Sequence, residues 1–320
     1  MDTSLWLWLG FGAGALALIA FDLGVVHRRD QPMTVRGAII LSAFYVALAC
    51  IFGAGFYWLK GPESGTEFFT GYLIEKALSV DNIFVFVLLF SFFSVPPQLQ
   101  YKVLFWGVLG ALVMRLVLIL AGAALLHEFH WLIYVFGGFL IFTGVKMLIA
   151  VNEEPNVGDS VMLRWTKRLI PISEKPMDGS FLTRENGKLI ATQLLLVLVL
   201  VEATDLIFAL DSIPAIFAIT EDPFIVYTSN VFAILGLRAL YFALAGIIHK
   251  FHLLKYALSL VLVFIGLKMV LNGIFGGKTI PTEWALLVTA LLIAGAVAGS
   301  LIWPKPEDAS EHSSQTSGTV

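Results

Sequence analysis

The chain has 320 residues, of which 58% are hydrophobic and only 13% are charged, and its net charge at pH 7 is −3. A soluble globular protein carries about a quarter charged residues, so this composition excludes an ordinary soluble domain. The mean hydropathy is +0.88, and the apolar runs reach about 20 residues, the length that a helix needs to cross a bilayer. A membrane β-barrel would instead show alternating segments of about ten residues. We therefore expect an all-α polytopic membrane protein.

These apolar runs predict nine membrane-spanning helices. In chain order they cover residues 5–26, 37–59, 68–93, 103–126, 131–150, 193–219, 225–248, 253–275 and 283–303. A polar loop, residues 151–190, follows the fifth helix, and the tail, residues 304–320, is rich in Ser, Glu and Thr and is expected to be disordered. The single cysteine, Cys50, excludes an intrachain disulfide.

The distribution of lysine and arginine predicts the orientation, because cytoplasmic loops carry an excess of both. Arg28, Arg29 and Arg36 place the first loop inside. The polar stretch 151–188 is placed inside by six more cations, namely Arg164, Lys167, Arg168, Lys175, Arg184 and Lys188. We expect the N-terminus outside, the C-terminus in the cytoplasm, and a location in the bacterial inner membrane.

A sequence repeat divides the helices into two groups of three. The segment 127–147 returns at 249–269 with ten of 21 positions identical, including two His, one Tyr, one Gly and one Lys. The copies cover residues 67–150 and 191–275, and residues 1–66, two helices, and 276–303, the last helix, stand outside them. An odd number of helices turns the second copy upside down, as in secondary transporters whose substrate sites lie at the midplane.

Acidic residues lie deep inside corresponding helices of the two copies. Glu75 and Asp81 are six residues apart in the first copy, and Asp205 and Asp211 are six apart in the second, with Glu202 one turn earlier. An ionised carboxylate in hydrocarbon costs about 3 kcal/mol, so such residues indicate function. Six residues correspond to a rotation of about 600°, so each pair is expected to line different parts of a cavity or to flank a break in its helix.

The groups beside these acids complete a set of hard oxygen donors. Asn82 follows Asp81 and Ser212 follows Asp211, while Pro214 is expected to free carbonyls by kinking the helix. Such oxygens suit Mg²⁺, Ca²⁺ or Mn²⁺, and the absence of His and Cys from these segments argues against Zn²⁺ and Cu⁺. The predicted metal ligands are Glu75, Asp81, Asn82, Glu202, Asp205, Asp211 and Ser212.

A structural interpretation stands beside the metal site, because the acids can instead form ion pairs with cations of the predicted helices, namely the charge partners Lys76, Arg115 and Arg238, or Lys146 and Lys268. The sequence has no P-loop and no Ser-His-Asp or Cys-His arrangement, so we expect no enzyme, no cofactor and no nucleic-acid partner. The expected partners are a divalent cation and the lipid bilayer. Export of Ca²⁺ or an organic cation, or a scaffold role in membrane assembly, are the alternatives.

Three segments resemble the TerC family of integral membrane proteins: GYLIEKALSVDNIFV at 71–85, EATDLIFALDSIPA at 202–215 and TSNVFAILGLR at 228–238. The resemblance extends from about the second predicted helix through the eighth. It implies a bacterial inner-membrane protein that exports Mn²⁺ or acts in tellurite and envelope stress resistance. Export of a divalent cation against an inward-negative potential costs about 4.6 kcal/mol per 100 mV, so we expect exchange for protons on one or more of the acids.

Overall fold

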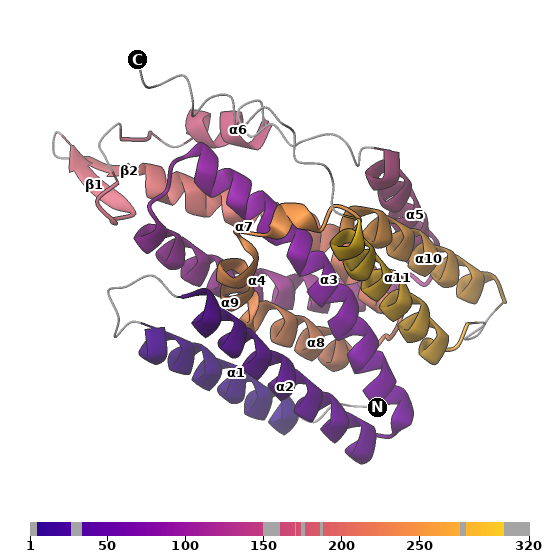
Figure 1. The fold of residues 1–320 in the computed structure, drawn as a ribbon. Coiled ribbons are helices and arrows are strands. Elements are labelled where there is room, and N and C mark those ends of the chain that lie inside the picture. Colours follow the sequence, from indigo (N-terminus) through magenta and orange to yellow (C-terminus); the bar gives the residue numbers. More distant parts are fainter. Residues whose placement is uncertain are drawn as a thin grey trace.

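The computed structural model describes residues 5–26, 34–149, 161–169, 171–173, 177–185, 188–275 and 280–303, and helices dominate this part of the chain (Figure 1). The helices are α1 (Leu5–Val26), α2 (Val35–Leu59), α3 (Pro62–Phe92), α4 (Pro97–Glu128), α5 (Leu132–Ile149), α6 (Val161–Leu169), α7 (Gln193–Phe217), α8 (Pro223–Leu235), α9 (Leu237–Leu244), α10 (Leu254–Phe275) and α11 (Thr282–Ile302), with a short 3₁₀ turn at Ile248–Lys250. The all-α fold is confirmed. The predicted tail and the cations Arg28 and Arg29 lie outside the described residues.

Seven helical segments of the described chain are long and apolar enough to cross a membrane: α2, α4, α5, α7, α8 together with α9, α10 and α11. Helix α1 contributes a shorter apolar segment, Leu5–Phe21. Helix α3 has 31 residues but carries Glu63, Glu67, Glu75, Lys76 and Asp81. A multi-pass membrane protein is therefore confirmed, while the total of nine spans and the orientation stay predictions.

Proline and capping residues explain several helix starts. Pro62, Pro97 and Pro223 occupy the first turns of α3, α4 and α8, where the missing N–H has no helical partner to lose. Asp222 caps α8 by accepting a hydrogen bond of 2.9 Å from the backbone N–H of Phe224. Helix α7 does not end at its internal proline but continues to Phe217.

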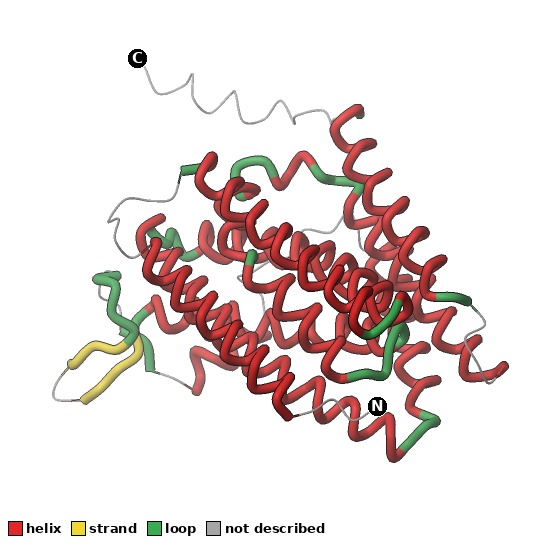
Figure 2. The backbone as a smooth tube through the Cα atoms, turned by 90° about the horizontal axis from the view of Figure 1, so that it is seen from below, coloured by secondary structure: helices red, strands yellow, loops and turns green. Residues whose placement is uncertain are grey.

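Helices α3, α4, α7 and α8 form the centre of the bundle, with α1 and α2 along one edge and α5, α10 and α11 along another (Figure 1). Figure 2 shows the same bundle of helices from below. Both α3 and α4 pack against α7 and α8, and α5 packs along α10. Suppose that α3 changes places with α7, α4 with α8, and α5 with α10. The set of these helix pairs then stays the same. These contacts fit the predicted inverted repeat, which itself stays a prediction.

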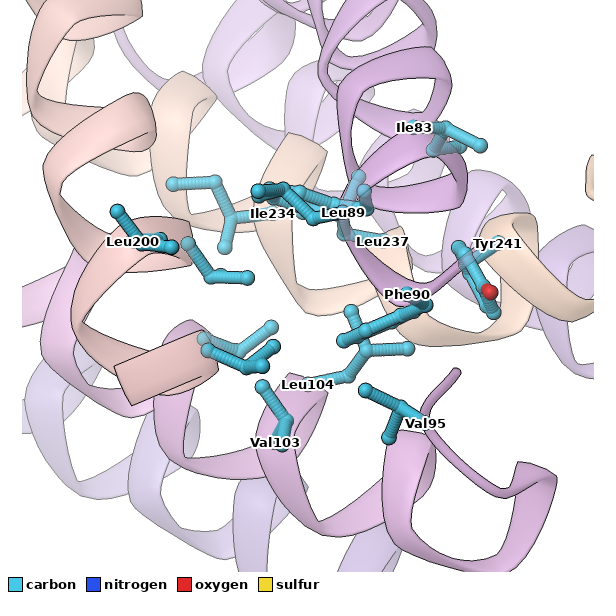
Figure 3. Packing of buried hydrophobic residues seen from close by; sticks show 14 of the residues in the cluster. Ile83, Leu89, Phe90, Val95, Val103, Leu104, Leu200, Ile234, Leu237 and Tyr241 are labelled. Atoms are coloured by element: carbon cyan, nitrogen blue, oxygen red, sulfur yellow. The ribbon is translucent and has the colours of Figure 1, made fainter. Parts of the chain in front are cut away.

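A large hydrophobic cluster fills the bundle around the C-terminal half of α3, the N-terminal halves of α4 and α7, and α9 (Figure 3). Its labelled members in the figure are Ile83, Leu89, Phe90, Val95, Val103, Leu104, Leu200, Ile234, Leu237 and Tyr241. The hairpin of β1 (Leu182–Glu185) and β2 (Lys188–Ala191) lies at the N-terminal end of α7, on this side of the bundle. The cluster therefore separates the middle of the bundle from the side that carries the hairpin.

Glycine lets α5 and α10 approach closely. A Cβ added at Gly137 would lie 2.6 Å from Val270 Cγ2 and 3.0 Å from the carbonyl oxygen of Gly266, whereas one at Gly138 would meet nothing within 4 Å. Small residues at such crossings allow backbone contact between membrane helices.

Gly137→Ala is expected to destabilise the protein by about 1–3 kcal/mol, because the added methyl overpacks this crossing. Gly138→Ala is the matched control and should be neutral or slightly stabilising, since alanine favours the helix. Thermal unfolding in detergent measures both. Equal unfolding midpoints for the two variants would contradict the close packing of α5 on α10.

Candidate functional site

Arg115 of α4 occupies the centre of the bundle and is only 1% exposed. Its Nη2 lies 3.1 Å from Oδ1 of Asp205, and its Nε lies 3.4 Å from Oδ2 of the same carboxylate. Its Nη1 donates to the carboxylate of Glu75, to the amide oxygen of Asn230 and, at 3.4 Å, to the hydroxyl of Ser212. One guanidinium thus joins α3, α4, α7 and α8, and its planar fork holds Asp205 through two nitrogens.

Two amides close this network. Nδ2 of Asn82 donates to Asp205 Oδ1 at 3.3 Å, and Nδ2 of Asn230 donates to Glu75 Oε2 at 3.4 Å. Each buried carboxylate therefore has both a charged and a neutral donor, which offsets the cost of removing it from water. The amide oxygen Oδ1 of Asn82 is buried and has no hydrogen-bond partner.

A small cavity of about 30 Å³ lies beside Arg115. Its polar lining consists of Glu75, Asp81, Asn82, Arg115, Asp211 and Ser212, and its apolar lining of Leu78, Met147, Phe208 and Leu262. A water molecule needs at least about 10–15 Å³ of such space. The cavity therefore has room for one or two waters or for a single dehydrated metal ion.

Glu75 and Asp81 face this cavity together although they are six residues apart. Helix α3 runs without interruption from Pro62 to Phe92, so of the two arrangements expected for this pair the structure has the shared cavity. Lys255 of α10 interacts electrostatically with the carboxylate of Asp81. Asp211 enters from α7, where its side chain bonds to Thr143 and lies near Lys146 of α5. Each of these two acids thus has a lysine from the α5–α10 pair nearby.

Glu202 lies apart from the other predicted ligands. It does not line the cavity, and its carboxylate rests against Gly110 of α4, where an added Cβ would meet Oε1 at 2.1 Å. Of the predicted metal ligands, the structure brings Glu75, Asp81, Asn82, Asp211 and Ser212 to the cavity. Asp205 does not line this cavity, but it contacts Asn82 and Arg115, which do.

The three predicted charge partners have different surroundings. Arg115 pairs with Glu75 and Asp205. Lys76 Nζ lies 3.3 Å from the carbonyl oxygen of Ala233. The guanidinium of Arg238 lies over the rings of Tyr101 and Phe105, at 4.8 and 5.3 Å from their centroids, which stabilises its charge without water.

Within the described ranges, no three His, Cys, Asp or Glu side chains gather closely enough to hold a metal ion. Arg115 stands between Glu75 and Asp205, so in this conformation the guanidinium neutralises both acids. Asn230 belongs to the network but was not among the predicted ligands. The polar run Thr228–Asn230 inside the apolar α8 is the sequence signal by which it could have been found.

A larger cavity of about 520 Å³ lies at the ends of α3 and α7 that are far from the hairpin. It is lined by polar residues, namely Glu67, His130, Thr220, Glu221, Lys268 and Asn272, and by apolar ones such as Phe217 and Met269. Glu67 precedes Glu75 by eight residues, or about 12 Å of helix rise. The two cavities share no lining residue, and these two turns of α3 lie between them.

Comparison with known proteins gives a family and several relatives. The family model "Integral membrane protein TerC family" matches residues 60–308. An "Uncharacterized membrane protein STKORF319" of Myxococcus xanthus is 54% identical over 90% of this chain and 89% of the relative. The "Putative membrane-bound redox modulator Alx" of Salmonella typhi is 50% identical over 79% of this chain and 82% of the relative, and that of Escherichia coli K12 is 49% identical over the same shares. No solved structure matches.

Proposed function

The chain belongs to the TerC family of integral membrane proteins, and we propose that it is a secondary transporter that exports a divalent metal cation, Mn²⁺ before others, in exchange for protons. In this proposal the protein is no enzyme, needs no cofactor and works in the bacterial inner membrane. The ion is its substrate, bound transiently by side chains of both copies.

The observation that carries this proposal is the convergence of acids from α3 and α7 on one cavity of about 30 Å³. Asp81 and Asp211 supply two carboxylates, and Asn82 supplies a buried amide oxygen that has no hydrogen-bond partner. A buried polar atom without a partner costs about 1–3 kcal/mol. A hard cation in the cavity would satisfy this oxygen together with the carboxylates.

Arg115 explains how the carrier can stay folded when no ion is bound. Without an ion, its guanidinium keeps Glu75 and Asp205 neutralised, so neither acid is left as an isolated charge at membrane depth. When a divalent cation binds, one acid exchanges Arg115 for the ion. Two states that differ by such a change of partner are what alternating access requires.

The volume of the small cavity also distinguishes between the alternative substrates. About 30 Å³ is too small for an organic cation with its own carbon skeleton, which favours a bare metal ion. Ca²⁺ uses the same oxygen donors as Mn²⁺, so it remains a competing substrate. The redox role in the names of the relatives finds no intrachain dithiol couple here, because the chain has the single cysteine Cys50.

Purified protein in liposomes tests the proposal. With a Mn²⁺-sensitive dye inside and a pH gradient across the bilayer, we expect Mn²⁺ movement that depends on the gradient and that Ca²⁺ slows by competition. Tetramethylammonium, which is too large for the cavity, should not compete. Folded protein that moves neither Mn²⁺ nor Ca²⁺ would instead support the scaffold role in membrane assembly or stress resistance.

A further inference from the structure

A groove of about 930 Å³, larger than both cavities described above, lies between α1 and α2. The two helices run along one edge of the bundle (Figure 1). Aromatic rings hold α1 against α8: Trp8 stacks on Tyr227 with 5.7 Å between the ring centroids, and Phe11 meets Phe232 at 5.9 Å. Because these rings fasten α1 to α8, the groove beside α2 stays open.

The shape of this groove suits an acyl chain. Apart from one lysine, every described residue that lines it is apolar. It extends along α1 from Trp6 to Phe21, a separation of 15 positions, or about 22 Å of helix rise. One leaflet contributes about half of the 30 Å hydrocarbon core of a bilayer. The groove is therefore long enough to take the full chain of a lipid.

Glycines hollow the groove out. Gly10 and Gly14 of α1 and Gly55 of α2 line it, and a Cβ added at any of them would meet nothing within 4 Å. At Gly53, by contrast, an added Cβ would lie 2.6 Å from the ring of Phe69. Gly53 thus serves the packing of α2 on α3, whereas the three groove glycines lie beside open space. A side chain in place of any of the three would take up room in the groove.

One end of the groove carries a positive charge. Lys60 follows α2 and is the only charged residue among the described ones that line the groove. Its Nζ lies 5.5 and 5.6 Å from the ring centroids of Phe56 and Phe224, which belong to the same lining. The ion pairs of the described residues do not include Lys60, and Glu63, three positions later, does not line the groove. An apolar wall that ends at a cation complements an amphipathic anion.

Tryptophans indicate that this end lies at the membrane surface. Trp6 near the start of α1 and Trp58 near the end of α2 are 81% and 85% exposed. Tryptophan is enriched where the hydrocarbon meets the headgroups. Lys60 follows Trp58 by two positions, so its ammonium group lies at the level of the lipid phosphates. The groove extends from there into the hydrocarbon.

We propose that the groove between α1 and α2 binds one anionic phospholipid, with an acyl chain along the glycines and the phosphate beside Lys60. A zwitterionic lipid has the same phosphate, but its own cation offsets the attraction to the lysine. One lysine near an anionic lipid surface is worth about a fivefold difference in binding. The inference does not rest on the proposed cation transport, because lipid binding is measured without a transported ion.

The first test varies the charge. Phosphatidylglycerol and phosphatidylcholine with identical acyl chains are titrated into the full chain in detergent. Binding is measured as the shift of the thermal unfolding midpoint and as bound lipid in native mass spectrometry. We expect one phosphatidylglycerol per chain and about fivefold weaker binding of phosphatidylcholine. Lys60→Gln should remove this difference and Lys60→Arg should keep it. Lys188→Gln, at an exposed position in the hairpin, is the matched control and should bind as the wild type does.

The second test fills the groove. Gly14→Leu places a side chain inside it and should abolish binding of both lipids. Gly12→Leu is the matched control on the same helix, because Gly12 does not line the groove and an added Cβ there also meets nothing within 4 Å. The unfolding midpoints without added lipid show whether both variants fold.

The remaining outcomes would overturn the proposal. Equal binding of the two lipids by the wild type, or an unchanged preference in Lys60→Gln, would refute recognition of the anionic headgroup. Wild-type binding by Gly14→Leu would show that the lipid binds outside the groove. A wild-type dimer that Gly14→Leu dissociates would show that a second copy of the chain, and not a lipid, covers the groove.

Discussion

Asp81→Asn and Asp211→Asn should each abolish Mn²⁺ movement driven by a pH gradient while leaving the protein folded. Both acids line the small cavity, one from α3 and one from α7, and asparagine keeps the shape but removes the charge. Loss of a residue that merely supports a ligand costs about 10- to 100-fold in metal affinity. Loss of a carboxylate that faces the ion should cost at least as much. Mn²⁺ flux in proteoliposomes and Mn²⁺ binding to protein in detergent measure the two effects.

Asp178→Asn is the matched control for these variants. Asp178 lies before the hairpin, where a hydrogen bond of 2.8 Å from the backbone of Ser180 lowers the pKa of its exposed carboxyl. The same chemical change at this position should leave flux and binding intact. Wild-type flux in either Asp81→Asn or Asp211→Asn would show that the cation does not use the cavity, and the acids would then be structural.

Arg115→Ala should destabilise the protein by about 3–5 kcal/mol, the usual cost of removing one partner of a buried ion pair. The substitution leaves Glu75 and Asp205 without a cation, and both are buried. Arg36→Ala, at an exposed position in α2, should change the free energy of unfolding by at most about 0.5 kcal/mol. Thermal unfolding in detergent compares the two variants.

Added Mn²⁺ should restore part of the stability of Arg115→Ala, because the ion can then bind between the two acids. Saturation at 100 times the dissociation constant would contribute about 2.7 kcal/mol. Arg115→Lys should be intermediate, since lysine keeps the charge but loses the fork that holds Asp205. An Arg115→Ala protein as stable as the wild type, and indifferent to Mn²⁺, would contradict the central role of Arg115.

The helices and the candidate acids were predictable because both signals are local. An unbroken apolar run of sufficient length specifies a spanning helix, since only a helix satisfies its own backbone in lipid. An acid inside such a run stands out at once, so Glu75, Asp81, Asp205 and Asp211 were found from the sequence. In the structure, Glu75, Asp81 and Asp211 line one cavity, while their role as metal ligands stays a prediction.

The rotation of each helix was not predictable, and the rotation decides which groups meet. In a soluble protein a polar face shows which side of a helix points outward, but lipid is as apolar as the core, so a membrane helix carries little such pattern. Hence nothing in the sequence showed that Arg115, and not Arg238, joins Glu75 to Asp205, or that Glu202 turns to Gly110.

The sequence by itself therefore determined the fold class, the family resemblance and the identity of the buried acids. Tertiary structure alone decided their partners, because the contacts join residues 40 to 155 positions apart along the chain. Asn230 shows the difference most simply. Its polar side chain was visible in the apolar α8, but its bonds to Arg115 and Glu75 exist only once three helices pack together.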